Sequence, residues 1–165
     1  MIIGILSDSH DHLTALRDAA AQMRAAGVEH VLWPGDFVAP FALPPIAELG
    51  VPVTAVLGNN DGERIGLAAR FASLGWNLAP KFNFPVLDGV RCALHHEQEP
   101  VEALAASGLY DLVVYGHTHD LDVRQVGDSW IINPGETCGW LTGRATMVLF
   151  DTTTRQPEVR ELARG

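Results

Sequence analysis

Two histidines separated by one residue follow an apolar run in the middle of the chain. The stretch reads Val113-Val114-Tyr115-Gly116-His117-Thr118-His119. Neutral imidazole is the commonest side-chain metal ligand. Gly116 lets the backbone turn so that both rings can reach one ion or two adjacent ions. The pair indicates a metal site, although two histidines on one loop are also typical of an ordinary surface.

Other potential ligands follow four further apolar runs. They are Asp8 and His10 after residues 2–6, Asp36 after 30–33, Asn59 after 53–57, and His95 and His96 after 90–94. Open α/β sheets place their chemistry just beyond the carboxyl ends of parallel strands, so we expect these side chains to converge. Taken singly, an Asp after a strand is typical of a helix cap, and Asn59 of a turn. A single metal centre would account for the polar residues after all five runs, which otherwise need five separate explanations.

The elements that must position these residues alternate in the first half of the chain. Apolar runs predict strands at 2–6, 30–33 and 53–57, with helices at 13–28, 42–49 and 68–73. A β-hairpin is predicted at 82–86 and 90–94, around Asp88-Gly89, then a helix at 99–107 and a strand at 109–115. Antiparallel strands are predicted at 121–126, 130–132, 146–150 and 157–162. This order predicts an α/β fold.

Length and composition indicate one soluble domain spanning residues 1–165. The 165 residues are 47% hydrophobic and 19% charged. The net charge of −9 argues against stable binding to nucleic acid or to an anionic membrane. The apolar N-terminus is too short for a signal peptide or membrane span, and two cysteines suit a reducing compartment. We therefore expect a cytoplasmic protein, with homo-oligomerisation left open.

Five motifs occur in a characteristic order. They are Asp8-Ser9-His10, Gly35-Asp36, Gly58-Asn59-Asn60-Asp61, Gly116-His117-Thr118-His119 and Asn133-Pro134-Gly135. Over about residues 1–150 the sequence resembles the calcineurin-like metallophosphoesterases, and most closely their small bacterial and archaeal phosphodiesterase branch. The resemblance implies a four-layer α/β/β/α sandwich of two mixed sheets with a two-metal site.

Carried over position by position, the resemblance implies the ligands of both ions. One ion would be held by Asp8, His10, Asp36 and His119, and the other by Asp36, Asn59, His96 and His117. Asp36 would bridge the two ions, and Asp36, Asn59 and His117 are predicted to be catalytic. The alternative to His96 is His95. We prefer His96 because the family's pattern places the ligand at position 96.

The implied ligand set suits manganese, our first expectation, or iron, nickel or zinc, better than calcium. Two such ions could bind a phosphoryl oxygen, create hydroxide from a shared water and stabilise the leaving oxygen. The expected protein is a dinuclear-metal phosphodiesterase acting on a small phosphoester. The alternatives are a phosphomonoesterase of the same fold and a non-catalytic scaffold like the retromer subunit of this family. The His-x-His-x-Asp-His run of metallo-β-lactamase-type hydrolases is absent from the sequence.

The chain departs from the family pattern at three places. Asn60 stands where many relatives carry a histidine that can protonate the leaving group. His95-His96-Glu97 replaces the usual His-Gly. Glu136 stands where serine is common, and either accepts a hydrogen bond from a ligand or is a solvated loop carboxylate. His12 and His30 are expected to be ordinary surface residues. Arg64 and Arg144 are expected to be solvated as well, with a phosphate contact as the alternative because they lie near the motifs in sequence.

Overall fold

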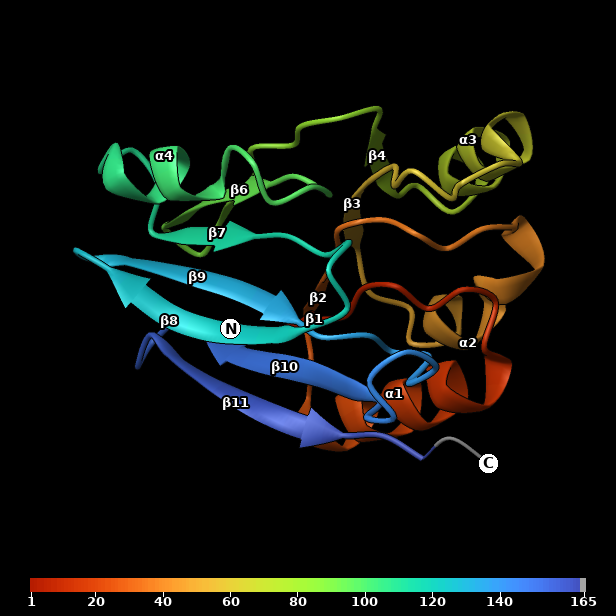
Figure 1. Cartoon of the computed structure of the whole chain (residues 1–165). Coiled ribbons are helices and arrows are strands. Elements are labelled where there is room, and N and C mark those ends of the chain that lie inside the picture. The colour runs from red at the N-terminus through yellow and green to blue at the C-terminus, as the bar shows by residue number, and fades with distance from the viewer. Residues whose placement is uncertain (164–165) are drawn as a thin grey trace.

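Two mixed β-sheets lie face to face between helices in the computed structural model, which describes residues 1–163 (Figure 1). The six-stranded sheet has the order β11 (Gln156–Glu161), β10 (Thr146–Asp151), β1 (Ile2–Ile5), β2 (His30–Trp33), β3 (Val53–Val56) and β4 (Asn77–Ala79). The five-stranded sheet has the order β5 (Val86–Leu87), β6 (Val90–Leu94), β7 (Leu112–Val114), β9 (Ser129–Pro134) and β8 (Leu121–Val126).

The strands that lead to the polar motifs run parallel within each sheet. β1, β2, β3 and β4 are parallel in the first sheet, and β6, β7 and β9 in the second. All four residues of β2 and of β3 are buried, as expected for short apolar strands covered on both faces. Because parallel strands end at the same edge of a sheet, the loops after them share that edge.

Three apolar clusters define four layers. One packs the helices α1 (Leu13–Ala26), α2 (Pro44–Ala47) and α3 (Arg64–Ser73) against the first sheet, through residues such as Leu16, Ile46 and Phe71. A second lies between the sheets and includes Ile5 and Val114. The third packs α4 (Val101–Ala106) on the second sheet, on the opposite side from α1 and α2 (Figure 1). The predicted α/β/β/α sandwich is confirmed.

Several predicted elements were wrong in detail. The predicted helix at 42–49 is a 3₁₀ turn η1 (Pro40–Ala42) followed by the single turn α2. The first arm of the hairpin is only β5, the strand at 109–115 shrinks to β7, and β4 was missed. β9 pairs antiparallel with β8, as predicted, but it also pairs parallel with β7, which was not predicted. Short elements depend on sheet neighbours far along the chain, which the local sequence does not specify.

No helix of the described residues combines the length and apolar character needed to cross a lipid bilayer.

Candidate metal centre

The loops after five parallel strands converge at one edge of the two sheets. They bring together all seven side chains predicted as ligands, namely Asp8, His10, Asp36, Asn59, His96, His117 and His119. Both carboxylates lie at the bottom of the site, since Asp8 is fully buried and Asp36 is 1% exposed.

One group of side chains surrounds Asp8. His10 Nε2 lies 3.3 Å from His119 Nε2, and His119 Nε2 lies 3.6 Å from Asp8 Oδ1. His10 Nε2 is also 3.5 Å from Asp36 Oδ2. The two imidazole rings stack with centroids 5.1 Å apart. Four potential ligand atoms therefore surround one small volume.

A second group surrounds Asn59. Its Oδ1 lies 2.9 Å from His96 Nε2 and 2.8 Å from His117 Nδ1. His96 Nε2 is 3.5 Å from Asp36 Oδ1. The two carboxylate oxygens of Asp36 thus face different histidines, Oδ2 toward His10 and Oδ1 toward His96. Asp36 is the side chain that the two groups share.

These distances fit divalent cations. Nitrogen and oxygen ligands bound at about 2.1 Å to one ion stand roughly 3 to 3.5 Å from one another. Burial raises the pKa of Asp8, because a carboxylate without solvent is costly to ionise. Cations between the groups would offset that cost and the repulsion between Asp8 and Asp36. The donor set of carboxylate, amide and imidazole therefore fits a pair of divalent ions.

The backbone at the site is strained. Left-handed φ angles occur at Asp8 (51°), His10 (42°), Asp36 (56°), His117 (68°) and His119 (65°). Residues other than glycine seldom adopt this conformation, and such strain clusters at functional sites. The strained backbone supports a functional role for these loops.

Two glycines of the motifs let the loops touch. A Cβ on Gly58 would collide with Asp36 Oδ1, and one on Gly116 would collide with Ser7 Oγ and Asp8 Oδ2. Only glycine permits these approaches without displacing a carboxylate. The glycines before Asn59 and His117 are therefore explained by packing between loops that are distant in sequence.

His95 and His96 point to different surroundings. His96 Nδ1 lies 2.6 Å from the Pro34 carbonyl oxygen, which can only accept, so Nδ1 donates and Nε2 is left as a lone-pair donor toward the site. The His95 ring instead packs on Phe82, with centroids 4.2 Å apart, and its Nδ1 lies 2.8 Å from the Glu97 carbonyl oxygen. The geometry favours His96 as the ligand.

Glu136 is a fully buried carboxylate, so its interpretation as a solvated loop residue was wrong. It accepts hydrogen bonds from His119 Nδ1 at 2.7 Å, from the Leu141 amide at 2.9 Å, and from the Thr142 amide and hydroxyl. Burial alone raises its pKa, but the bonds from His119 and Thr142 outweigh burial and lower the pKa to about 2. The Nδ1 contact directs His119 Nε2 toward the site.

Asp61 supports the site, although it was not predicted as a site residue from the sequence. It is 1% exposed and accepts hydrogen bonds from the backbone amides of Asp36 (3.1 Å), Val38 (2.7 Å) and Gly58 (2.7 Å). It therefore ties the loop after β2 to the loop after β3. The signal was its place at the end of the motif Gly58-Asn59-Asn60-Asp61.

Asn60 contacts the shared carboxylate directly. Its side-chain nitrogen donates to Asp36 Oδ2 at 2.8 Å, and its backbone amide donates to Asp36 Oδ1 at 2.9 Å. The residue that replaces the expected histidine is thus inside the site.

The two arginines and two histidines outside the predicted ligand set make contacts with other parts of the protein. Arg64 Nε donates to the Asp61 carbonyl at 3.0 Å, and Arg144 pairs with Glu161 at 3.0 Å. His30 was expected at the surface, but it is 9% exposed and contacts Thr54 Oγ1 at 2.9 Å. His12 is half-buried, and its Nδ1 accepts from the Ala15 amide at the start of α1.

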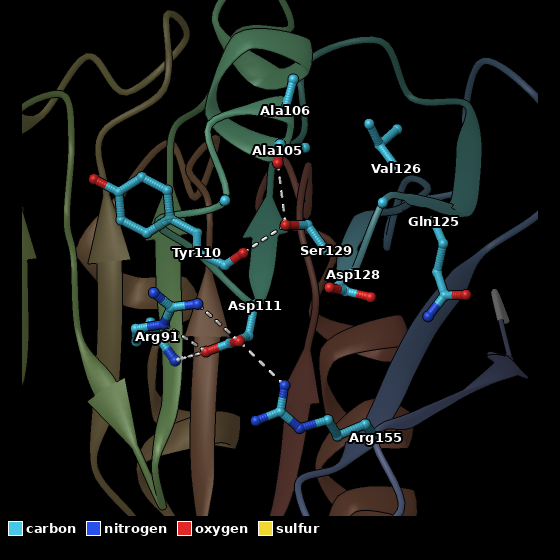
Figure 2. A pocket seen from close by; sticks show the side chains of 12 residues that line it. Arg91, Ala105, Ala106, Tyr110, Asp111, Gln125, Val126, Asp128, Ser129 and Arg155 are labelled. Carbon is cyan, nitrogen blue, oxygen red and sulfur yellow. Dashed lines mark hydrogen bonds and ion pairs between the residues drawn. The ribbon is translucent and has the colours of Figure 1, made fainter.

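A separate cavity of about 870 Å³ lies at the opposite end of β7 (Figure 2). Asp111, just before β7, accepts hydrogen bonds from Arg91 Nε and Nη2 and from Arg155 Nη1 at 3.0 to 3.1 Å. The two guanidinium groups are thereby partly neutralised. We therefore keep the candidate active site at the carboxyl ends of the strands and not at this cavity.

Comparisons with known proteins agree with this geometry. Residues 1–155 match the calcineurin-like phosphoesterase superfamily domain. A phosphodiesterase of Methanocaldococcus jannaschii is 39% identical over 165 residues, which cover 98% of each chain. The solved structure of an archaeal phosphodiesterase has a TM-score of 0.92 and 37% identity, covering 98% of this chain and all of its own.

A more distant structure shares the fold alone. The phosphoesterase Yfce of E. coli has a TM-score of 0.69 and 20% identity, covering 99% of this chain and all of its own. The family match, the close relatives and the convergent polar loops lead to one conclusion: this chain belongs to the calcineurin-like phosphoesterase superfamily and is a metal-dependent phosphoesterase.

Proposed function

We propose that the protein hydrolyses phosphodiesters with the help of two divalent ions. The observation that carries the proposal is the position of Asp36, whose two oxygens face His10 and His96 in separate groups. The proposed ligands of one ion are Asp8, His10, Asp36 and His119, and those of the other are Asp36, Asn59, His96 and His117. When bound, the ions supply Lewis acidity and a water activated at neutral pH.

The side chains around Asp36 organise this site. Asp36 is shared by the two groups of ligands. Asn60 donates hydrogen bonds to its carboxylate, and Asp61 accepts one from its backbone amide. His117 is exposed beside Asn59, so it is accessible to a phosphoryl group. Its backbone amide donates to Asp8 at 3.1 Å, which fixes the loop. We assign Asp36, Asn59 and His117 to catalysis on this basis.

Two observations support a diester over a monoester. Arg64 and Arg144, two basic residues close to the motifs in sequence, bond to the Asp61 carbonyl and to Glu161. A dianionic monoester would therefore find little added positive charge beyond the ions. The relative that is 39% identical is named a phosphodiesterase. We therefore propose a small phosphodiester as substrate, handled by residues 1–165 as a single domain.

The test compares two chromogenic esters. Bis(p-nitrophenyl) phosphate should be cleaved when the protein is supplied with Mn²⁺, our proposed metal, and much more slowly after chelation. The diester should also give a higher kcat/KM than p-nitrophenyl phosphate. Parallel assays with Fe²⁺, Ni²⁺ and Zn²⁺ rank the metals. Metal binding without turnover of either ester would instead favour the non-catalytic scaffold.

Asn60 allows a further prediction about the substrate, because an amide cannot act as an acid that protonates the leaving group. General acid catalysis contributes about 10² to 10⁴ in rate, and its absence falls hardest on poor leaving groups. We predict that aryl diesters are cleaved much faster than alkyl diesters. The check is a series of diesters with graded leaving-group pKa, run on the parent and on Asn60→His. A shallow dependence in the parent, unchanged by the substitution, would reveal another acid.

A further inference from the structure

Trp140 is an exposed aromatic side chain at the rim of the candidate metal centre. It is 60% exposed, although it lies next to two histidines of the loop after β1. Its ring centroid is 6.2 Å from that of His10 and 5.6 Å from that of His12, whose ring plane is nearly perpendicular to the indole. An indole beside a proposed ligand, with much of its surface in solvent, is available to a bound substrate.

The loop that carries Trp140 is anchored at both ends. Before it, the amides of Thr137 and Cys138 donate to the carbonyls of Ser7 (2.9 Å) and Asp8 (3.2 Å). After it, the amides of Leu141 and Thr142 donate to the buried Glu136 carboxylate. The same carboxylate binds the proposed ligand His119. The backbone on both sides of Trp140 is therefore tied to the metal centre.

We propose that Trp140 is a specificity residue that stacks on a planar ring of the substrate. The preferred diester then carries an aryl or nucleobase group on at least one side. The inference rests on the proposed function, whose site supplies the phosphate-binding part. Because Arg64 and Arg144 already bond to other groups of the protein and the net charge is −9, a contact that does not depend on charge would add to the affinity that the ions supply. A rigid indole supplies such a contact.

The experiment measures binding rather than turnover, so leaving-group chemistry does not enter. Phenylphosphonate and methylphosphonate differ only in the ring, and their affinities for the Mn²⁺-loaded protein are measured by titration calorimetry. Adenosine 5′-monophosphate against ribose 5-phosphate is the second pair, which differs in the base alone and distinguishes a nucleobase from an aryl preference. The variants are Trp140→Leu, Trp140→Phe and the control Leu141→Ala, since Leu141 is 75% exposed on the same loop.

Stacking of a base or aryl ring on an aromatic side chain is worth about 10-fold or more in affinity. We expect the wild type to prefer the ring in at least one pair by about that factor, and Trp140→Leu to bring the two affinities within about twofold. Trp140→Phe should keep most of the preference, and Leu141→Ala all of it.

An unchanged ring preference in Trp140→Leu, or no preference in the wild type, would overturn the inference. Failure of the proposed function has a different signature. In that case the wild type leaves bis(p-nitrophenyl) phosphate intact with each metal, while the calorimetric comparison still reports whether Trp140 selects a ring.

Discussion

Replacing Glu136 with glutamine should weaken both the fold and the metal centre. In the protein, one Glu136 oxygen accepts from the amide and hydroxyl of Thr142, and the other accepts from His119 Nδ1 at 2.7 Å. An amide group retains one acceptor and places an N–H₂ donor where the second acceptor was. In either orientation of the glutamine amide, its N–H₂ group faces a buried donor, either the Thr142 amide or the donors on the His119 side.

The size of the effect follows from these contacts. A hydrogen bond to a charged group contributes about 1.5 to 3 kcal/mol, and a buried donor left without a partner adds a cost of similar size. We expect Glu136→Gln to lose about 3 kcal/mol of unfolding free energy, or about 6 to 12 °C in Tm for a domain of this size. If the amide N–H₂ faces His119, that ring must place its proton on Nε2, which removes the lone pair directed at the ion. Metal affinity should fall about 10- to 100-fold.

Thermal unfolding without metal and Mn²⁺ titration of the folded protein measure the two effects separately. Thr142→Val is the matched control, because it removes the hydroxyl bond to Glu136 but leaves His119 untouched. It should lower Tm by less and leave metal affinity unchanged. If Glu136→Gln binds Mn²⁺ as tightly as the wild type, Glu136 does not orient His119 and the reasoning fails.

Three further predictions concern the shared ligand, the histidine pair and the far cavity. Asp36→Ala should abolish diester hydrolysis and lower the bound metal from two ions, because both groups lose their common carboxylate; metal analysis that finds two ions with near-normal turnover would remove the dinuclear proposal. His96→Ala should weaken binding of one ion far more than His95→Ala, as metal titrations can show, and the opposite ranking would move the ligand to His95. Hydrogen bonds from Arg91, assisted by Arg155, hold the pKa of Asp111 well below its usual value of 3.8. The ionised Asp111 therefore stabilises the fold fully above pH 3.8, and this stabilisation is lost as the pH falls below 3.8. Asp111→Asn should therefore lower Tm at pH 7, and the difference from wild type should shrink at about pH 2 to 3; a difference that does not change with pH would contradict the ion pairing.

The sequence determined the class of fold and the residues available for chemistry. Short apolar runs that end in Asp8, Asp36, Asn59 and the Gly116–His119 stretch predicted strand ends with polar loops, because strand periodicity and turn chemistry are local properties. Their order along the chain indicated the family that the comparisons then showed.

The tertiary structure decided what local pattern cannot encode. Whether Glu136 is solvated or buried depends on a loop that folds back over it, through the amides of Leu141 and Thr142. The parallel pairing of β9 with β7 and the existence of β4 depend on neighbours distant in sequence. The same holds for Asp36, because only the packing of separate loops directs its two oxygens toward different histidines.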